Sequence, residues 1–141
     1  MVRMVKDYRK NPGVIQLARE IVRDLPQGDI SGEIRALQSF VRDHIRYTND
    51  PNSVELLQTP EATLEMGTGD CDDKSILLAT LLNSIGRPAR FAAISLKPSD
   101  KYSHVLVQAR IGTNWYPLET IRDVPAGWSP DNISRVMIAH I

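Results

Sequence analysis

The only cysteine of the chain, Cys71, stands among carboxylates in the stretch MGTGDCDDKSI at positions 66–76. A thiolate is a good nucleophile, but Asp70, Asp72 and Asp73 all oppose a negative charge on its sulfur. Asp70 can serve as an N-cap and Asp73 as its partner in a variant capping box, which predicts Cys71 in the first turn of a helix. The helix end favours a thiolate by about 0.3–1 kcal/mol, or about 2 kcal/mol when partly buried. Because the carboxylates oppose it by a similar amount, a cation must come from elsewhere in the chain.

Three histidines could supply that cation. His44 lies near the end of a predicted helix, where an exposed or positively charged side chain is ordinary. His140 stands one residue from the last position. His104 opens a strand-like run after a polar loop, and an imidazolium is the usual partner of a reactive thiol. His104 is therefore the candidate base.

Glu119 is the candidate acid beside His104. The run HVLVQARI at 104–111 alternates with a period of two, and the compact turn GTN separates it from WYPLETI at 115–121, which predicts an antiparallel hairpin. Glu119 would then lie opposite His104 or one diagonal away, within reach of a carboxylate–imidazole hydrogen bond. Trp115 shares the strand parity of Glu119 and could screen the pair from water. On geometry alone, a solvated Glu119 is an equally good interpretation.

Helical patterns precede and include Cys71, and strand patterns follow it. We expect helices at 12–25, from near 31 to 45, at 60–66 and at 71–85, and strands at 89–96, 104–111 and 115–121. The segment 48–60 is interpreted as a long, partly ordered loop. The tail 124–141 is expected to fold back on the core, with Trp128 as an anchor. Helices first and strands later indicate an α+β domain with helices packed on an antiparallel sheet.

The composition is that of one globular domain of 141 residues, so we assign 1–141 to a single domain with a flexible, solvated segment at 1–10. Seventeen basic residues balance seventeen acidic ones, which argues against a nucleic acid or a membrane surface recognised by bulk charge. One cysteine cannot form an internal disulfide. No apolar run approaches the roughly 20 residues that span a bilayer, and no signal-peptide core is visible. Cytoplasmic residence is therefore expected.

Three stretches together resemble the transglutaminase-like superfamily of papain-like cysteine enzymes. They are RYTND at 46–50, GDCDDKSILLATLLNSIGRPARF at 69–91 and HVLVQARIGTNWYPLE at 104–119. The last two follow the family's order of Cys, then His, then an acid. The resemblance implies a papain-like, transglutaminase-core fold, in which N-terminal helices and a central Cys-bearing helix pack on an antiparallel sheet. It also points to a small bacterial or phage-encoded member.

Carried over by position, the resemblance makes Cys71 the nucleophile, His104 its base and ion-pair partner, and Glu119 the acid that orients His104. Two residues depart from the family pattern. The acid is usually Asp, one methylene shorter than Glu119, and Leu106 stands where an aromatic residue is common. Neither departure removes a reacting atom.

The chemistry expected of these residues is acyl transfer from an amide through a thioester on Cys71. The backbone amide of Cys71 is the natural first oxyanion donor. Tyr47 and Asn49 are candidates for the second donor, and Trp115 for a substrate contact. The expected partner is a peptide or protein substrate, and no metal or organic cofactor is required, because the Asp residues near Cys71 lack the paired spacing of metal ligands.

The acyl acceptor is left open by the residues themselves. Water would make the protein a cysteine protease or amide hydrolase, and a lysine or other amine would make it a transglutaminase. Analogy within the family favours hydrolysis. A non-catalytic binding or assembly module is the competing class, and no oligomeric state is indicated.

Overall fold

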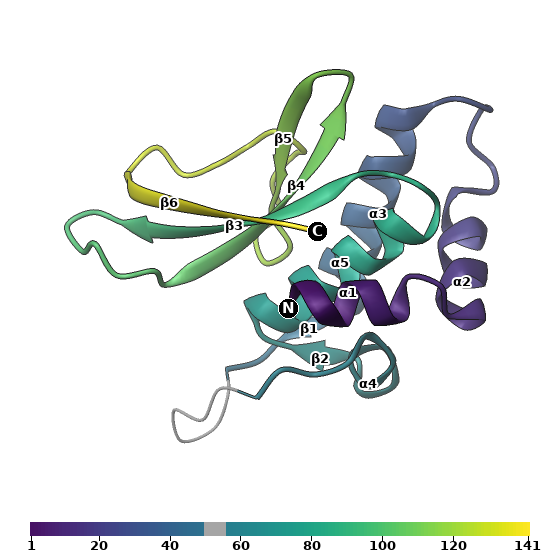
Figure 1. Cartoon of the computed structure of the whole chain (residues 1–141), viewed down its shortest axis with the longest axis horizontal. Helices are drawn as coiled ribbons and strands as arrows, with labels where there is room; N and C mark the ends of the chain where they lie inside the picture. Colours follow the sequence, from purple (N-terminus) through teal and green to yellow (C-terminus); the bar gives the residue numbers. More distant parts are fainter. Residues whose placement is uncertain (50–55) are drawn as a thin grey trace.

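The computed structural model describes residues 1–49 and 56–141 and packs a group of helices against one face of an antiparallel sheet (Figure 1). The helices are α1 (Val2–Tyr8), α2 (Pro12–Val22), α3 (Ile30–His44), α4 (Pro60–Met66) and α5 (Cys71–Ser84). The strands are β1 (Arg46–Tyr47), β2 (Thr68–Gly69), β3 (Ala89–Leu96), β4 (His104–Ile111), β5 (Asn114–Leu118) and β6 (Ile133–His140). The predicted α+β class is confirmed. Residues 50–55 of the predicted loop at 48–60 lie outside the described residues.

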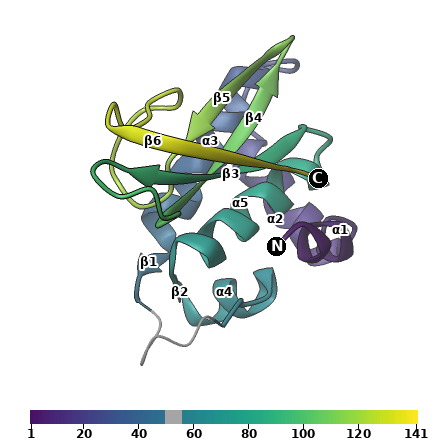
Figure 2. The same ribbon diagram turned by 60° about the vertical axis from the view of Figure 1, so that its left-hand side comes forward.

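The central helix α5 is apolar nearly all round because it is covered on nearly every side. It contacts α1, α2, α3 and α4 and also the sheet strands β3 and β4 (Figure 2). Its largest apolar side chains are fully buried: Ile76, Leu77, Leu78, Leu81 and Leu82. The core of the domain is therefore built around the helix that begins with Cys71.

Local capping signals place α2, α3 and α4 where the sequence predicts them. The Asn11 side chain accepts hydrogen bonds from two backbone amides at the start of α2, with Pro12 as the first helical residue. Asp29 caps α3 by accepting from the Gly32 amide. Gly67, with a φ of 68°, ends α4 in the left-handed conformation.

The main sheet has the strand order β5-β4-β3-β6, and all its pairs are antiparallel. β4 and β5 form the predicted hairpin, with Val107 opposite Leu118, and Gly112 turns the chain with a φ of 62°. β5 is shorter than expected, since it ends at Leu118. Glu119 therefore follows the last paired residue of the hairpin.

The tail returns to the sheet as β6, an edge strand paired with β3. The prediction that it folds back is correct, but its strand was not recognised. Trp128, expected as a core anchor, is only partly buried, with the Arg122 guanidinium 5.7 Å from the centre of its ring.

The first ten residues differ from the expected flexible segment. They contain α1, whose Val5 is fully buried and whose contacts with α5 are extensive. Val2 and Met4 also pack against the core cluster. The basic residues between them hid a short amphipathic pattern that tertiary packing stabilises. None of the helices in residues 1–49 and 56–141 is long and apolar enough to cross a membrane.

Candidate active site

Cys71 is the first residue of α5, and the capping box predicted around it is present. The Asp73 amide donates to Asp70 Oδ1 at 2.9 Å, and the Asp70 amide donates to Asp73 Oδ2 at 3.2 Å. The two carboxylates satisfy amides that the helix leaves unpaired. The Cys71 amide is held at the same helix start, where it can face a ligand.

Asp73 also holds the segment that precedes α5. It is fully buried, and it accepts hydrogen bonds of 2.8 Å from the backbone amide and from the side-chain Nε2 of Gln58. Gly69 passes so close that an added Cβ would lie 2.8 Å from the Asp73 Cβ. The contact of Gln58 with Asp73 could not be predicted from the sequence, because a single glutamine in a loop belongs to no periodic pattern.

The sulfur of Cys71 is in an environment that favours the neutral thiol. Burial raises the pKa of Cys71 to about 11, and Asp72 and Asp70 add to the rise, although the backbone amides of Val105 and Asp72 lower it. The ion pair of Cys71 with His104 stays a prediction, and the surroundings of the sulfur oppose its thiolate. Desolvation and the nearby carboxylates both disfavour a negative charge on the sulfur. Their combined effect on the pKa is larger than that of the two amides, which favour the thiolate.

His104 and Glu119 make the hydrogen bond that the hairpin predicts. His104 Nε2 lies 2.8 Å from Glu119 Oε2, and the Glu119 side chain is only 1% exposed. The register of the hairpin puts Leu118 opposite Val107, so Glu119 reaches His104 from a diagonal position. The alternative of a solvated Glu119 is wrong, because the hairpin end is covered by the helices.

The backbone around Glu119 fixes this carboxylate. Oε1 accepts from the amides of Thr120 at 2.9 Å and Ile121 at 3.0 Å, and the Glu119 carbonyl accepts from Gln38 Nε2 of α3 at 3.1 Å. Burial acts to raise the pKa of Glu119, but the bond and charge of His104 and the two amides outweigh it, so the pKa lies below its usual value. The carboxylate is thus ionised at neutral pH and accepts the Nε2 proton of His104. Nδ1 is then the ring nitrogen able to take a proton.

Cys71 and His104 line the same cavity, which has a volume of about 250 Å³. Two contacts hold α5 against the start of β4. The Cys71 sulfur meets the Val105 amide, and the Ser75 hydroxyl donates to the Val105 carbonyl at 3.5 Å. The cavity therefore brings a thiol and an imidazole together from segments that are distant in sequence.

Tyr47 and Asn49 line this cavity too, as the prediction of their involvement requires. The short parallel pairing of β1 with β2 sets Tyr47 opposite Gly69, just before the capped turn, and the Tyr47 hydroxyl donates to Asn49 Oδ1. Their roles as oxyanion donors stay predictions. Trp115 is elsewhere: it packs near His140, with the Arg90 guanidinium 4.2 Å from its ring centre. Trp115 pairs with Arg110 near the turn of the hairpin, so β5 carries it away from His104 and Glu119.

Lys74 is a buried charge near the site that the sequence analysis did not single out. Its side chain donates from Nζ to the Ile45 carbonyl at 2.6 Å and to the Arg42 carbonyl at 3.3 Å, and it is 1% exposed. Burial lowers the pKa of Lys74, while the nearby Glu119 carboxylate acts to raise it. Its position within an all-round apolar helix was the signal that could have identified it. Lys74 ties the end of α3 to the helix that carries Cys71.

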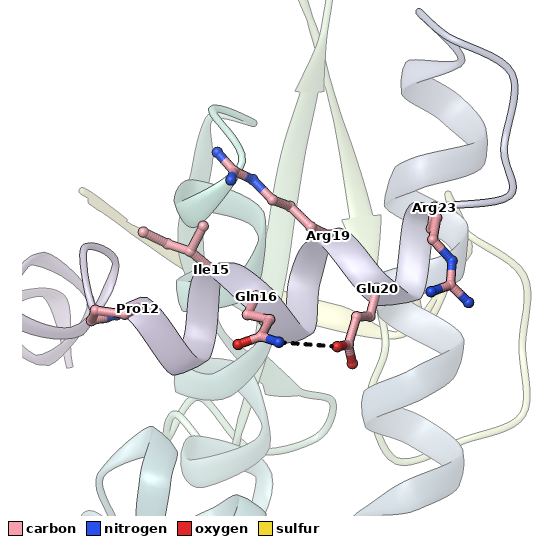
Figure 3. Close-up of a pocket in the computed structure, with 6 residues that line it drawn as sticks. All are labelled: Pro12, Ile15, Gln16, Arg19, Glu20 and Arg23. Carbon is pink, nitrogen blue, oxygen red and sulfur yellow. Dashed lines mark hydrogen bonds between the residues drawn. The ribbon is translucent and has the colours of Figure 1, made fainter.

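A larger hollow of about 590 Å³ lies over the outer surface of α2, away from these residues (Figure 3). It is lined by Pro12, Ile15, Gln16, Arg19, Glu20 and Arg23. Its polar groups include a Gln16–Glu20 hydrogen bond of 3.4 Å within one helix, and no thiol or imidazole. The smaller cavity has the chemistry, so we place the candidate site there.

Comparisons with known proteins support the same region. The model of the transglutaminase-like superfamily matches residues 15–120, which include Cys71, His104 and Glu119. None of the curated proteins compared with the chain matches it.

Similar solved structures share the fold at low sequence identity. Calcium-bound LapG of Legionella pneumophila superposes with a TM-score of 0.69 at 14% identity, covering 98% of this chain and 84% of LapG. A proposed cysteine protease from Cytophaga hutchinsonii gives 0.66 at 17% identity, covering 95% of this chain and 48% of that one. A proposed protease from Parabacteroides distasonis gives 0.66 at 14% identity, covering 86% and 25%. The chain thus spans about half of the length of the Cytophaga hutchinsonii protein and about a quarter of that of the Parabacteroides distasonis protein.

Proposed function

Because this chain belongs to the transglutaminase-like superfamily, we propose that it is a cysteine hydrolase that cleaves an amide bond in a peptide or protein. Cys71 is the nucleophile, His104 the general base and acid, and Glu119 the group that orients His104. The observation that carries the proposal is the shared cavity of Cys71 and His104, with His104 bonded at 2.8 Å to the buried Glu119 carboxylate.

In the proposed reaction, His104 Nδ1 takes the thiol proton as the Cys71 sulfur bonds to the substrate carbonyl carbon. The carbonyl oxygen becomes an oxyanion, to which the Cys71 backbone amide donates. Glu119 stabilises the imidazolium that forms. The C–N bond then breaks, and His104 returns its proton to the departing amine, leaving a thioester.

Water completes the cycle. His104 removes a proton from the water that attacks the thioester, and the thiol leaves with that proton as the carboxylic acid is released. The attack by Cys71 also needs a general base, because a thiol with a pKa of about 11 is protonated at neutral pH. Two of the structurally similar proteins are proposed proteases, which supports water as the acceptor.

Calcium needs separate consideration, since LapG is calcium-bound in one similar structure. Asp73 already uses both oxygens for donors within the protein, from Gln58 and Asp70. Residues 1–49 and 56–141 contain no group of three or more His, Cys, Asp or Glu side chains placed to hold a metal ion. The His, Cys, Asp and Glu side chains of residues 1–49 and 56–141 therefore do not form a calcium site, and we route no step through one. We expect equal rates with EGTA and with added calcium.

The role of His104 is tested by alkylation. Iodoacetamide should react with Cys71 at pH 7 faster than a thiol of pKa about 11 allows, since His104 takes the proton, and His104→Ala should slow the reaction at least tenfold. Arg19→Gln, on α2, serves as the matched surface control. A thiol whose alkylation rate is the same in wild type and His104→Ala would support the non-catalytic module instead.

The reaction itself is tested with a peptide library, with and without a primary amine. We expect new termini in the wild type and none with Cys71→Ala. Preferential incorporation of the amine would show that an amine, not water, accepts the acyl group. The protein would then be a transglutaminase.

A further inference from the structure

A second cavity of about 250 Å³ is also lined by His104, but not by Cys71. Tyr47, Ser103 and His104 line both cavities, so the two cavities adjoin at these residues. We call them the Cys71 half and the far half of the cleft. The far half is lined by the apolar side chains of Leu96, Ile121 and Pro130 and by Arg122. At this size it suits a side chain or a short chain end, because whole small-molecule sites usually occupy about 300–1,000 Å³.

The chemistry assigns each half of the cleft to one part of a substrate. The acyl group becomes bonded to Cys71, so it occupies the half that holds the sulfur. The departing amine receives its proton from His104, so the leaving group extends past the imidazole into the far half. This assignment rests on the function proposed above.

The two halves carry opposite charges. Asp70 and Asp72 line the Cys71 half. The far half is bordered by the exposed Arg122, whose guanidinium lies 5.7 Å from the Trp128 ring centre. The other charge there, Glu119, is 1% exposed and is already bonded to His104 and two amides. An exposed guanidinium keeps N–H groups that can donate to a carboxylate.

We propose that Arg122 selects a leaving group that carries a carboxylate, bound in the far half of the cleft. That carboxylate comes either from an Asp or Glu side chain next to the cleaved bond or from the free C-terminus of a short departing fragment. Asp70 and Asp72 disfavour the same group in the other half, so the charges also fix the direction in which a peptide lies.

The test compares matched peptides that differ only after the cleaved bond. The first set has Glu, Gln or Lys there, and the second has a free or an amidated C-terminus. The wild type should give a kcat/KM about fivefold higher for a carboxylate than for its neutral counterpart, mostly through KM and less at high salt. If kcat/KM depends on the Glu side chain, the bound carboxylate is that side chain. If it depends on the free C-terminus, the bound carboxylate is the chain end.

Variants of Arg122 make the assignment specific. Arg122→Gln should cleave the Glu and Gln peptides equally, and Arg122→Glu should reverse the preference towards Lys. Arg19→Gln, which removes a charge from the α2 surface, should keep the wild-type ratio. A wild-type ratio near one, or an unchanged ratio in Arg122→Gln, would overturn the inference while leaving the hydrolase proposal in place.

A binding measurement separates the two proposals. Titration of Cys71→Ala with the leaving fragments should show tighter binding of the carboxylate form, and the additional change Arg122→Gln should abolish the difference. If no peptide is cleaved but this difference is found, the proposed hydrolysis fails and the subsite stands. Equal binding of both fragments would remove the subsite.

Discussion

Glu119 uses its extra methylene, relative to Asp, to hold two kinds of partner at once. Oε2 meets His104 at 2.8 Å, while Oε1 reaches back to the amides of Thr120 and Ile121. The carboxylate is thereby fixed from both sides without help from solvent, which a loosely held strand residue could not provide. This geometry shows how a Glu at position 119 could take the role that we propose for it, although the resemblance led us to expect Asp there.

At Cys71, the raised pKa becomes a prediction about alkaline stability. A folded-state pKa of about 11, above the ordinary value of 9.0, means that the native thiol holds its proton more tightly than the unfolded one. The contribution of the protonated thiol to the free energy of unfolding is fully present below about pH 9. It is lost as the pH rises through about 11. Cys71→Ser has no such group, so the free energy of unfolding of the wild type should fall more steeply than that of the variant across this range.

Urea unfolding of both proteins at pH 7, 9, 10 and 11 measures this difference. Because Cys71 is partly exposed, the slope of the difference should stay below the roughly 1.4 kcal/mol per pH unit of one fully coupled site. Parallel curves for the two proteins would show that burial does not shift the thiol.

The elements of the site differ in how far the sequence could predict them. The start of α5 and the β4–β5 hairpin were predictable because caps, a compact turn and alternation act between near neighbours. The burial of Glu119 was not predictable, because it depends on contacts with residues far away in the sequence. One example is the hydrogen bond from Gln38 of α3, 81 positions earlier, to the Glu119 carbonyl. Gln58 and Lys74 likewise act through contacts that leave no periodic trace. Local sequence patterns therefore predicted the position of Cys71 and His104 in their helix and strand. They did not predict the tertiary contacts around these residues.

The start of α5 should be sensitive to one carboxylate in particular. Asp73→Ala removes the acceptor of the Asp70 amide and of both Gln58 donors in a fully buried place. We expect a loss of about 1–3 kcal/mol in the free energy of unfolding, together with slower cleavage as Cys71 loses its fixed position. The control is Asp24→Ala, whose carboxylate is 95% exposed, with an expected change within about 0.5 kcal/mol. Equal stabilities of the two variants would contradict the role given to Asp73.

On the scale of the whole molecule, the cleft lies where three regions meet. They are the start of α5, the start of β4 and the paired segments β1 and β2. α1 lies beside α5 and joins these regions (Figure 1). Met1, just before α1, lines the Cys71 cavity, and Val5 packs into the core around α5. The first residues thus contribute to both the cavity wall and the core.

Val5→Ala tests this contribution of α1. A helix of seven residues has little stability of its own, so α1 depends on the burial of Val5, which is 0% exposed. Removing two carbon atoms from this position should cost about 1.5–3 kcal/mol in urea unfolding, as lost transfer energy plus a cavity. Val136→Ala on β6 is the matched control, because that valine is 50% exposed, and it should cost clearly less. If the two substitutions cost the same, α1 would be a solvated segment after all, and Met1 would have no fixed place beside Cys71.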